Sequence, residues 1–207
     1  MADLERFALF IDGASCHKVF KVLGISVDYK LLLEEFRSRG RLVRAYYYSA
    51  IVETGEFVSL RPLVDWLSYN GFSVATKPAK EVINPDGRNW YDGKMSTKIA
   101  VDAMEIADKV DHIILFTGDG DLRCLVKAIQ RKGVRVSIAS TMHTDSPIVA
   151  DELRRQADEF IELAHIAPRI GRAAPSMEEA PSFTRDYKAS KGLGKTVHNV
   201  TNASAAG

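Results

Sequence analysis

The stretch HIILFTGDGD, residues 112–121, decides the fold class because it joins a continuous apolar run to a turn of glycines and aspartates. An uninterrupted apolar run of this length is typical of a strand that is buried on both faces, as in a parallel sheet. The stretch FALFIDG, residues 7–13, repeats the arrangement near the N-terminus. Two such strands predict an α/β fold whose aspartates lie at the carboxyl ends of its sheet.

Outward from these two stretches, predicted strands alternate with predicted helices. Such alternation implies right-handed crossovers and a mostly parallel sheet with helices on both faces. Between them, residues 77–93 lack periodicity and predict a long surface loop. The predicted strands are 7–11, 42–48, 72–76, 112–116, 134–139 and 160–163, and the predicted helices are 28–40, 61–70, 95–110, 122–130 and 148–157.

Length and composition favour one domain, residues 1–171, followed by a tail, residues 172–207. The tail is rich in Ala, Pro, Ser, Thr, Asn and Lys, and it is predicted to be disordered because it cannot bury enough apolar surface.

The net charge of +1 excludes a protein-wide field that attracts nucleic acid. Cys16 and Cys124 lack the spacing of metal ligands, so a reducing compartment is favoured. With no targeting segment evident, we expect a cytoplasmic protein.

The aspartates at the two strand ends are candidate ligands for a hard divalent cation. Asp12 follows the first strand, and Asp119 and Asp121 follow the fourth; carboxylates that converge there would bind Mg²⁺ or Mn²⁺. The alternative is that each aspartate is a turn or helix-capping residue. Asp102 lies on the predicted inward face of its helix, where it either joins the metal site or forms a salt bridge with Lys98.

The region around the predicted loop combines cations with aromatic residues, a mixture that suits single-stranded nucleic acid. The alternative is an ordinary solvated loop. The residues concerned are Lys77, Lys80, Arg88, Trp90, Tyr91 and Lys94.

The ordered set of motifs resembles the NYN domain family, which is related to PIN-domain nucleases, and within it the LabA-like bacterial proteins. The motifs are FIDG (10–13), KIAVDAM (98–104), LFTGDGD (115–121) and GVRVSIAS (133–140). The resemblance implies a PIN-like, Rossmannoid fold and hydrolysis of RNA, with single-stranded RNA favoured. It also implies catalytic and metal-binding roles for four aspartates and substrate contacts from four neighbours: Asp12, Asp102, Asp119 and Asp121, then Ser15, Lys94, Ser96 and Thr117.

The chain departs from the family pattern in three ways. Ser15 stands where the family usually has Asn, and in a second motif Ser96 stands where it has Asp and Asp92 where it has Lys. The third departure, Leu122 in place of Phe, is conservative. The leading hypothesis is a metal-dependent ribonuclease. The second is a catalytically weakened regulatory module that binds RNA or a protein, and a homodimer is left open. A phosphatase is disfavoured, because Gly13 and Ala14 follow Asp12 without a second aspartate.

Overall fold

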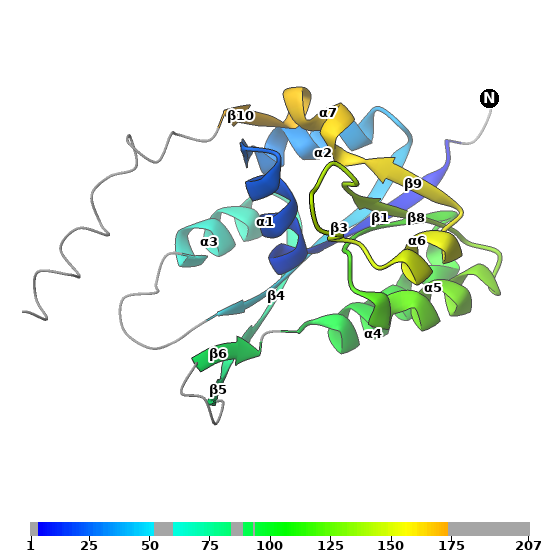
Figure 1. The fold of residues 1–207 in the computed structure, drawn as a ribbon. Helices are drawn as coiled ribbons and strands as arrows, with labels where there is room; N and C mark the ends of the chain where they lie inside the picture. The colour runs from blue at the N-terminus through cyan, green and yellow to red at the C-terminus, as the bar shows by residue number, and fades with distance from the viewer. Residues whose placement is uncertain (1–3, 52–59, 84–88, 93, 174–207) are drawn as a thin grey trace, which may run out of the picture. The chain divides into compact units, whose positions relative to one another are not determined.

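Six parallel strands form the central sheet, in the order β4-β3-β1-β7-β8-β9 (Figure 1). The structure, a computed structural model, describes residues 4–51, 60–83, 89–92 and 94–173. The tail predicted from residue 172 therefore lies outside the described residues from position 174 onward. The strands are β1 Arg6–Asp12, β3 Arg41–Ile51, β4 Phe72–Pro78, β7 His112–Phe116, β8 Arg135–Ser140 and β9 Glu159–Glu162.

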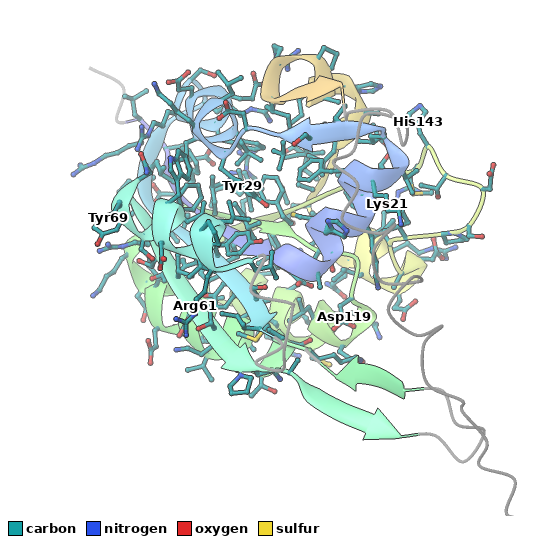
Figure 2. The ribbon with its side chains drawn as sticks, turned by 90° about the vertical axis from the view of Figure 1, so that its left-hand side faces the viewer. Lys21, Tyr29, Arg61, Tyr69, Asp119 and His143 are labelled. Carbon is teal, nitrogen blue, oxygen red and sulfur yellow. The ribbon has the colours of Figure 1, made fainter. Side chains whose placement is uncertain are left out.

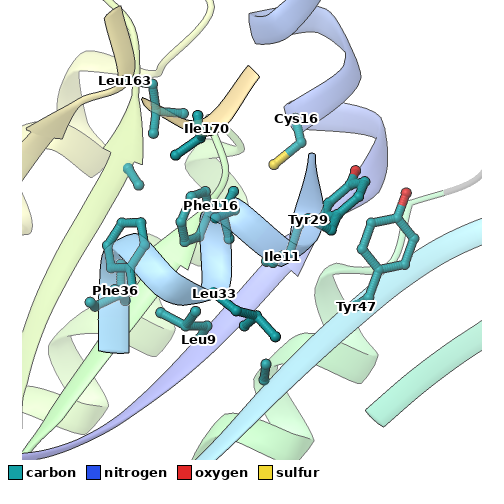
Figure 3. Packing of buried hydrophobic residues seen from close by; sticks show 14 of the residues in the cluster. Leu9, Ile11, Cys16, Tyr29, Leu33, Phe36, Tyr47, Phe116, Leu163 and Ile170 are labelled. Atoms are coloured by element: carbon teal, nitrogen blue, oxygen red, sulfur yellow. The ribbon is translucent and has the colours of Figure 1, made fainter. Parts of the chain in front are cut away.

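Helices cover both faces of the sheet, which confirms the predicted α/β class. Along β1, Phe7, Leu9 and Ile11 enter one core, and Ala8 and Phe10 enter the other. The first core, shown in Figure 3, packs against α1 Gly13–Val22, α2 Tyr29–Arg37, α3 Arg61–Tyr69 and α7 Leu163–Ile170. The second core packs against α4 Ser96–Ile106, α5 Arg123–Gln130 and α6 Asp151–Gln156. Among the described residues, no helix is long and apolar enough to cross a membrane.

The strand order reverses at β1, and this reversal positions the site. The chain passes from β1 to β3 and β4 on one side, then returns to β7 and continues to β8 and β9 on the other. In open parallel sheets, ligands bind beyond the carboxyl ends of the strands at such a switch point. Here the switch point lies between β1 and β7, the two strands that end in aspartate motifs.

Two predicted segments differ in the structure. The predicted loop 77–93 contains two antiparallel strands, β5 Lys80–Ile83 and β6 Asn89–Asp92, which pair with each other. Their β-prone residues flank a Pro-Asp-Gly turn signal, so a hairpin was predictable. The helix predicted from 148 begins only at 151, because the Ala150 amide donates to the Gly118 carbonyl at 3.0 Å instead of joining a helix.

Several short elements were not predicted at all. Helices α1 and α7 fall in segments to which the sequence patterns assigned no helix. The same holds for β2 Ile25–Val27 and β10 Gly171–Ala173, which pair antiparallel at the edge of the first core. β10 contains the last residues that the structure describes.

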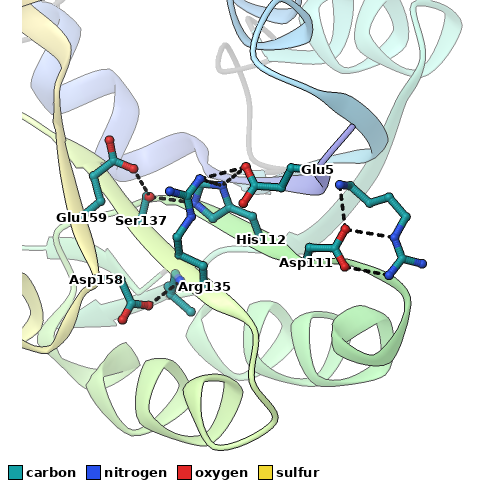
Figure 4. Close-up of polar contacts among 9 residues, drawn as sticks. Glu5, Asp111, His112, Arg135, Ser137, Asp158 and Glu159 are labelled. Carbon is teal, nitrogen blue, oxygen red and sulfur yellow. Dashed lines mark hydrogen bonds and ion pairs between the residues drawn. The ribbon is translucent and has the colours of Figure 1, made fainter. Parts of the chain in front are cut away.

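A polar network at the amino ends of the strands surrounds a buried histidine, His112 (Figure 4). Ser137 Oγ donates to Glu159 Oε2 at 2.9 Å, so it must accept from His112 Nε2 at 2.7 Å. Arg135 Nη2 donates to His112 Nδ1 at 3.0 Å and to Glu5 Oε2 at 2.8 Å. These bonds assign a neutral imidazole with its proton on Nε2.

The free energy of unfolding should therefore depend on His112 in mildly acid solution. The pKa of His112 is lowered from 6.5, first by burial and then by the Arg135 charge, while Glu5 and Glu159 oppose the shift. The unfolded chain takes up this proton as pH falls below about 6.5, whereas the folded chain resists it. The contribution of His112 is thus complete above that pH and is lost as pH falls from there toward the folded-state pKa.

Urea unfolding of the parent and of His112→Gln at pH 7.5 and 5.5 measures this effect. The Gln side chain can still donate to Ser137, but it does not titrate. We expect the parent to lose on the order of 1 kcal/mol more than the variant between the two pH values. Equal losses would show that His112 does not contribute to the acid sensitivity.

Candidate active site

Asp12 ends β1 and caps helix α1. Its Oδ1 accepts from the Ala14 amide at 3.1 Å, and its Oδ2 accepts from the Ser15 hydroxyl at 2.6 Å. Gly13 lets the backbone pass close to β3, since a Cβ there would lie 2.6 Å from the Tyr47 hydroxyl oxygen and 2.9 Å from the Tyr48 carbonyl oxygen. The capping role that the sequence offered for Asp12 is therefore confirmed. Its carboxylate also lies at the switch point of the sheet.

Asp119 has the same arrangement beyond β7, and Figure 2 labels its position. Its Oδ1 accepts from the Asp121 amide at 3.1 Å, and its Oδ2 accepts from the Ser96 hydroxyl at 2.6 Å. Its own amide donates to Thr117 Oγ1 at 3.1 Å. Because Ile11 of β1 pairs with Phe116 of β7, Asp12 and Thr117 continue neighbouring strands. The Asp119 turn therefore begins beside Asp12.

The two serines that depart from the family pattern lie directly on the candidate carboxylates. Ser15 comes from the first turn of α1, and Ser96 is the first residue of α4. Each hydroxyl donates to one oxygen of its aspartate, so a neutral hydroxyl oxygen lies beside each carboxylate. Sequence spacing predicted neither hydrogen bond.

Asp121 is the exposed member of the group. Its carboxylate accepts from Lys94 Nζ at 2.8 Å, and both side chains are 66% exposed. An exposed pair of this kind contributes little to stability. The Lys94 ammonium group therefore lies at the edge of the turn formed by residues 118–121, called the acidic turn below. A phosphate oxygen could replace Asp121 as its partner there.

Asp102 is buried and is engaged by two donors. Lys98 Nζ donates to its Oδ1 at 2.7 Å, and the Tyr48 hydroxyl donates to its Oδ2 at 2.9 Å. The hydrogen bond and charge of Asp102 raise the pKa of Lys98. Burial, then the bond to Asp102, raises the pKa of Tyr48. The salt bridge weighed from the sequence is thus present, and Tyr48 is an additional partner that the sequence did not indicate.

The donor set suits Mg²⁺ or Mn²⁺ in a site with few protein ligands. Within the described ranges, no group of three or more His, Cys, Asp or Glu side chains is arranged to hold a metal ion. Mg²⁺ is commonly held by one or two carboxylates together with waters and substrate phosphates, and not by an all-protein cage. Asp12 and Asp119 fit that description, because a carboxylate oxygen that accepts one hydrogen bond retains a second lone pair.

Glu152 is a further carboxylate beside the site that sequence reasoning missed. A Cβ placed on Gly120 would lie 2.7 Å from Glu152 Oε1, so this side chain of α6 lies against the acidic turn. The charge pattern of α6 gave no signal for this, because the contact depends on how α6 packs.

The comparisons with known proteins identify the family. The model of the NYN domain matches residues 6–164, most of the chain. This chain belongs to the NYN domain family. NYN domains are typically nucleases, and the matched segment contains all the candidate residues named above.

One curated relative and one solved structure extend the comparison. The chain is 29% identical over 166 residues to the low amplitude and bright protein LabA of Synechococcus elongatus, covering 78% of this chain and 86% of LabA. The crystal structure of a protein of unknown function from Vibrio parahaemolyticus superposes with a TM-score of 0.65 at 24% identity. It covers 83% of this chain and 99% of the Vibrio chain, and it supports the fold alone.

Proposed function

We propose that this NYN domain is a metal-dependent ribonuclease that hydrolyses phosphodiesters of single-stranded RNA at Asp12 and Asp119. The observation that carries the proposal is the position of these two carboxylates, at and just beyond the carboxyl ends of adjacent strands, at the topological switch point of the sheet. Family membership supports the same reaction class.

The protein groups divide into metal ligands, positioning residues and groups that act on the substrate. Asp12 and Asp119 would hold Mg²⁺ or Mn²⁺, with the hydroxyls of Ser15 and Ser96 fixing the two carboxylates. Once bound, the cation supplies Lewis-acid polarisation of the phosphate and a more acidic water. Asp121 lies at the exposed edge, where it can accept a proton from the attacking water. Lys94 offers a cation to a non-bridging phosphate oxygen.

Asp102 has a supporting role in this arrangement. Both of its oxygens accept from protein donors, Lys98 and Tyr48, and it is largely buried. The carboxylate fixes Lys98 near the start of α4, the helix whose first residue, Ser96, contacts Asp119. We therefore assign Asp102 to positioning, and not to direct metal binding.

Cleavage of a mixed pool of single-stranded RNAs tests the proposal. We expect products with 1 mM Mn²⁺ or Mg²⁺ and none after excess EDTA, with activity restored when the cation is returned. The same titration should raise the melting temperature, because a ligand that binds only the folded state stabilises it. A protein that binds the pool but cuts nothing under any of these conditions would contradict the nuclease proposal.

That outcome would favour the second candidate, an RNA-binding regulatory module of the same fold. The specific observation behind it is that Ser15 and Ser96 occupy one oxygen each of Asp12 and Asp119. A hydroxyl is a weaker, neutral ligand than the carboxylate that the family has at position 96, which would weaken metal binding.

A further inference from the structure

A cavity of about 480 Å³ lies directly beside the acidic turn, a size typical of small-molecule sites. Gly118, immediately before Asp119, forms one side of it. The segment after β8 forms most of the rest, with Met142, Pro147, Ile148, Val149 and Ala150. The wall is therefore mainly apolar, and Asp151 and Arg154 are its charged members.

We propose that this cavity binds one nucleobase of single-stranded RNA, next to the phosphodiester held at Asp12 and Asp119. The inference rests on the proposed function and names a subsite for its substrate. An apolar wall can pack against the face of any base, so it suits a substrate whose bases are unpaired. Met142, 46% exposed, offers a polarisable thioether for such a contact.

The wall is preformed and is anchored at both ends. The Met142 amide donates to Glu162 Oε2 at 2.8 Å, and Glu162 also caps α7 through the Ala164 amide. At the other end, the Ala150 amide donates to the Gly118 carbonyl at 3.0 Å. A base in the cavity would therefore contact a segment that is hydrogen-bonded to the turn carrying Asp119.

A cation among the lining residues can contact the base edge. Arg154 of α6 lines the cavity, and its guanidinium lies over the Phe160 ring, 5.4 Å from the centroid. This stacking orients the guanidinium, whose donors match acceptors on a base edge. Arg155, the next residue, pairs instead with Asp151 at 2.8 Å and does not line the cavity.

A second cavity, of about 430 Å³, continues the path for the nucleic acid backbone. It shares Ile148 with the first, and Lys18 and Lys21 of α1 line its other side. Figure 2 shows Lys21 and His143 on the same side of the view as Asp119. Two lysines beyond the base subsite are suited to the phosphate of a neighbouring nucleotide. The two cavities thus give a direction for the strand away from Asp119.

The test is a double-mutant cycle between the protein and the RNA. Fluorescein-labelled pentaribonucleotides, one intact and five with a single abasic position, are titrated with the full chain, with Ca²⁺ replacing Mg²⁺. For the parent, we expect one abasic position to weaken binding about tenfold, the effect of one stacked base. In Met142→Ala, intact RNA should bind about fivefold more weakly, and the abasic penalty at that position should largely disappear.

Matched controls separate the cavity from general effects. Val43→Ala removes an apolar side chain of similar exposure outside the cavity and should leave all six affinities unchanged. Arg154→Gln should weaken intact RNA more than Arg155→Gln, although each removes one positive charge from α6. Melting temperatures confirm that each variant is folded.

Two results have different meanings. If the parent binds the RNAs but no abasic penalty depends on Met142, the base subsite is wrong and the proposed nuclease stands. If the parent binds none of the six RNAs, with Ca²⁺ or with Mn²⁺, the proposed function fails, and the subsite fails with it.

Discussion

Asp119→Asn should reduce Mn²⁺-dependent RNA cleavage by about a hundredfold or more, because a lost metal ligand removes several kcal/mol of transition-state stabilisation. The fold should change little. Asn keeps a carbonyl oxygen that can accept from the Asp121 amide, and Asn and Asp are comparable at caps. Initial rates at saturating Mn²⁺, compared with melting temperatures, separate loss of chemistry from loss of structure.

Asp108→Asn is the matched control for this variant. It makes the same charge change at an exposed aspartate whose partner is Lys132, at 2.6 Å, outside the candidate site. Its cleavage rate should stay within about twofold of the parent, since surface changes usually have small effects. If Asp119→Asn cleaves RNA as fast as Asp108→Asn, the reaction does not use the carboxylate beyond β7.

The sequence predicted the frame of the site because that frame depends on local patterns. The apolar run at 112–116 matches β7 residue for residue. The helix predicted from residue 28 is α2, which Asp28 caps by accepting from the Lys30 and Leu31 amides. The inward position of Asp102 and its bond to Lys98 follow from helical periodicity alone. Each of these features lies within a few residues of its cause.

The missed features depend on contacts between distant segments. Helix α1 contains Gly, Ser, Cys and Val, which are weak helix formers, and its stability comes from packing Cys16, Val19 and Phe20 against the sheet. Ser96 reaches Asp119 only because α4 begins beside the β7 turn. Neither segment has a periodicity from which these contacts could be predicted. The residue types of the candidate site could therefore be read from the sequence, and the hydrogen bonds between distant segments could not.

The close contact between the acidic turn and residues 148–150 leads us to expect a large loss of stability when Gly118 is replaced. A Cβ on Gly118 would lie 2.1 Å from the Ile148 carbonyl oxygen and 3.1 Å from Val149 Cα. Both neighbours are backbone atoms, which cannot rotate away as a side chain can. At Gly120, the first neighbour of such a Cβ is Glu152 Oε1 at 2.7 Å, the end of a flexible side chain.

We therefore expect Gly118→Ala to be far more harmful than Gly120→Ala, although both add one methyl group to the same turn. Relieving the first clash must separate the 148–150 segment from the turn and break the hydrogen bond from the Ala150 amide to Gly118. Overpacking of this kind costs about 2–3 kcal/mol, which lowers the melting temperature by roughly 4–12 °C. Glu152 can move away in Gly120→Ala, so its loss should stay below about 1 kcal/mol. The entropy that alanine removes from the unfolded chain is common to both variants and cancels in the comparison. Thermal unfolding of the two proteins measures the difference, and equal melting temperatures would show that the 148–150 segment does not press on the turn in solution.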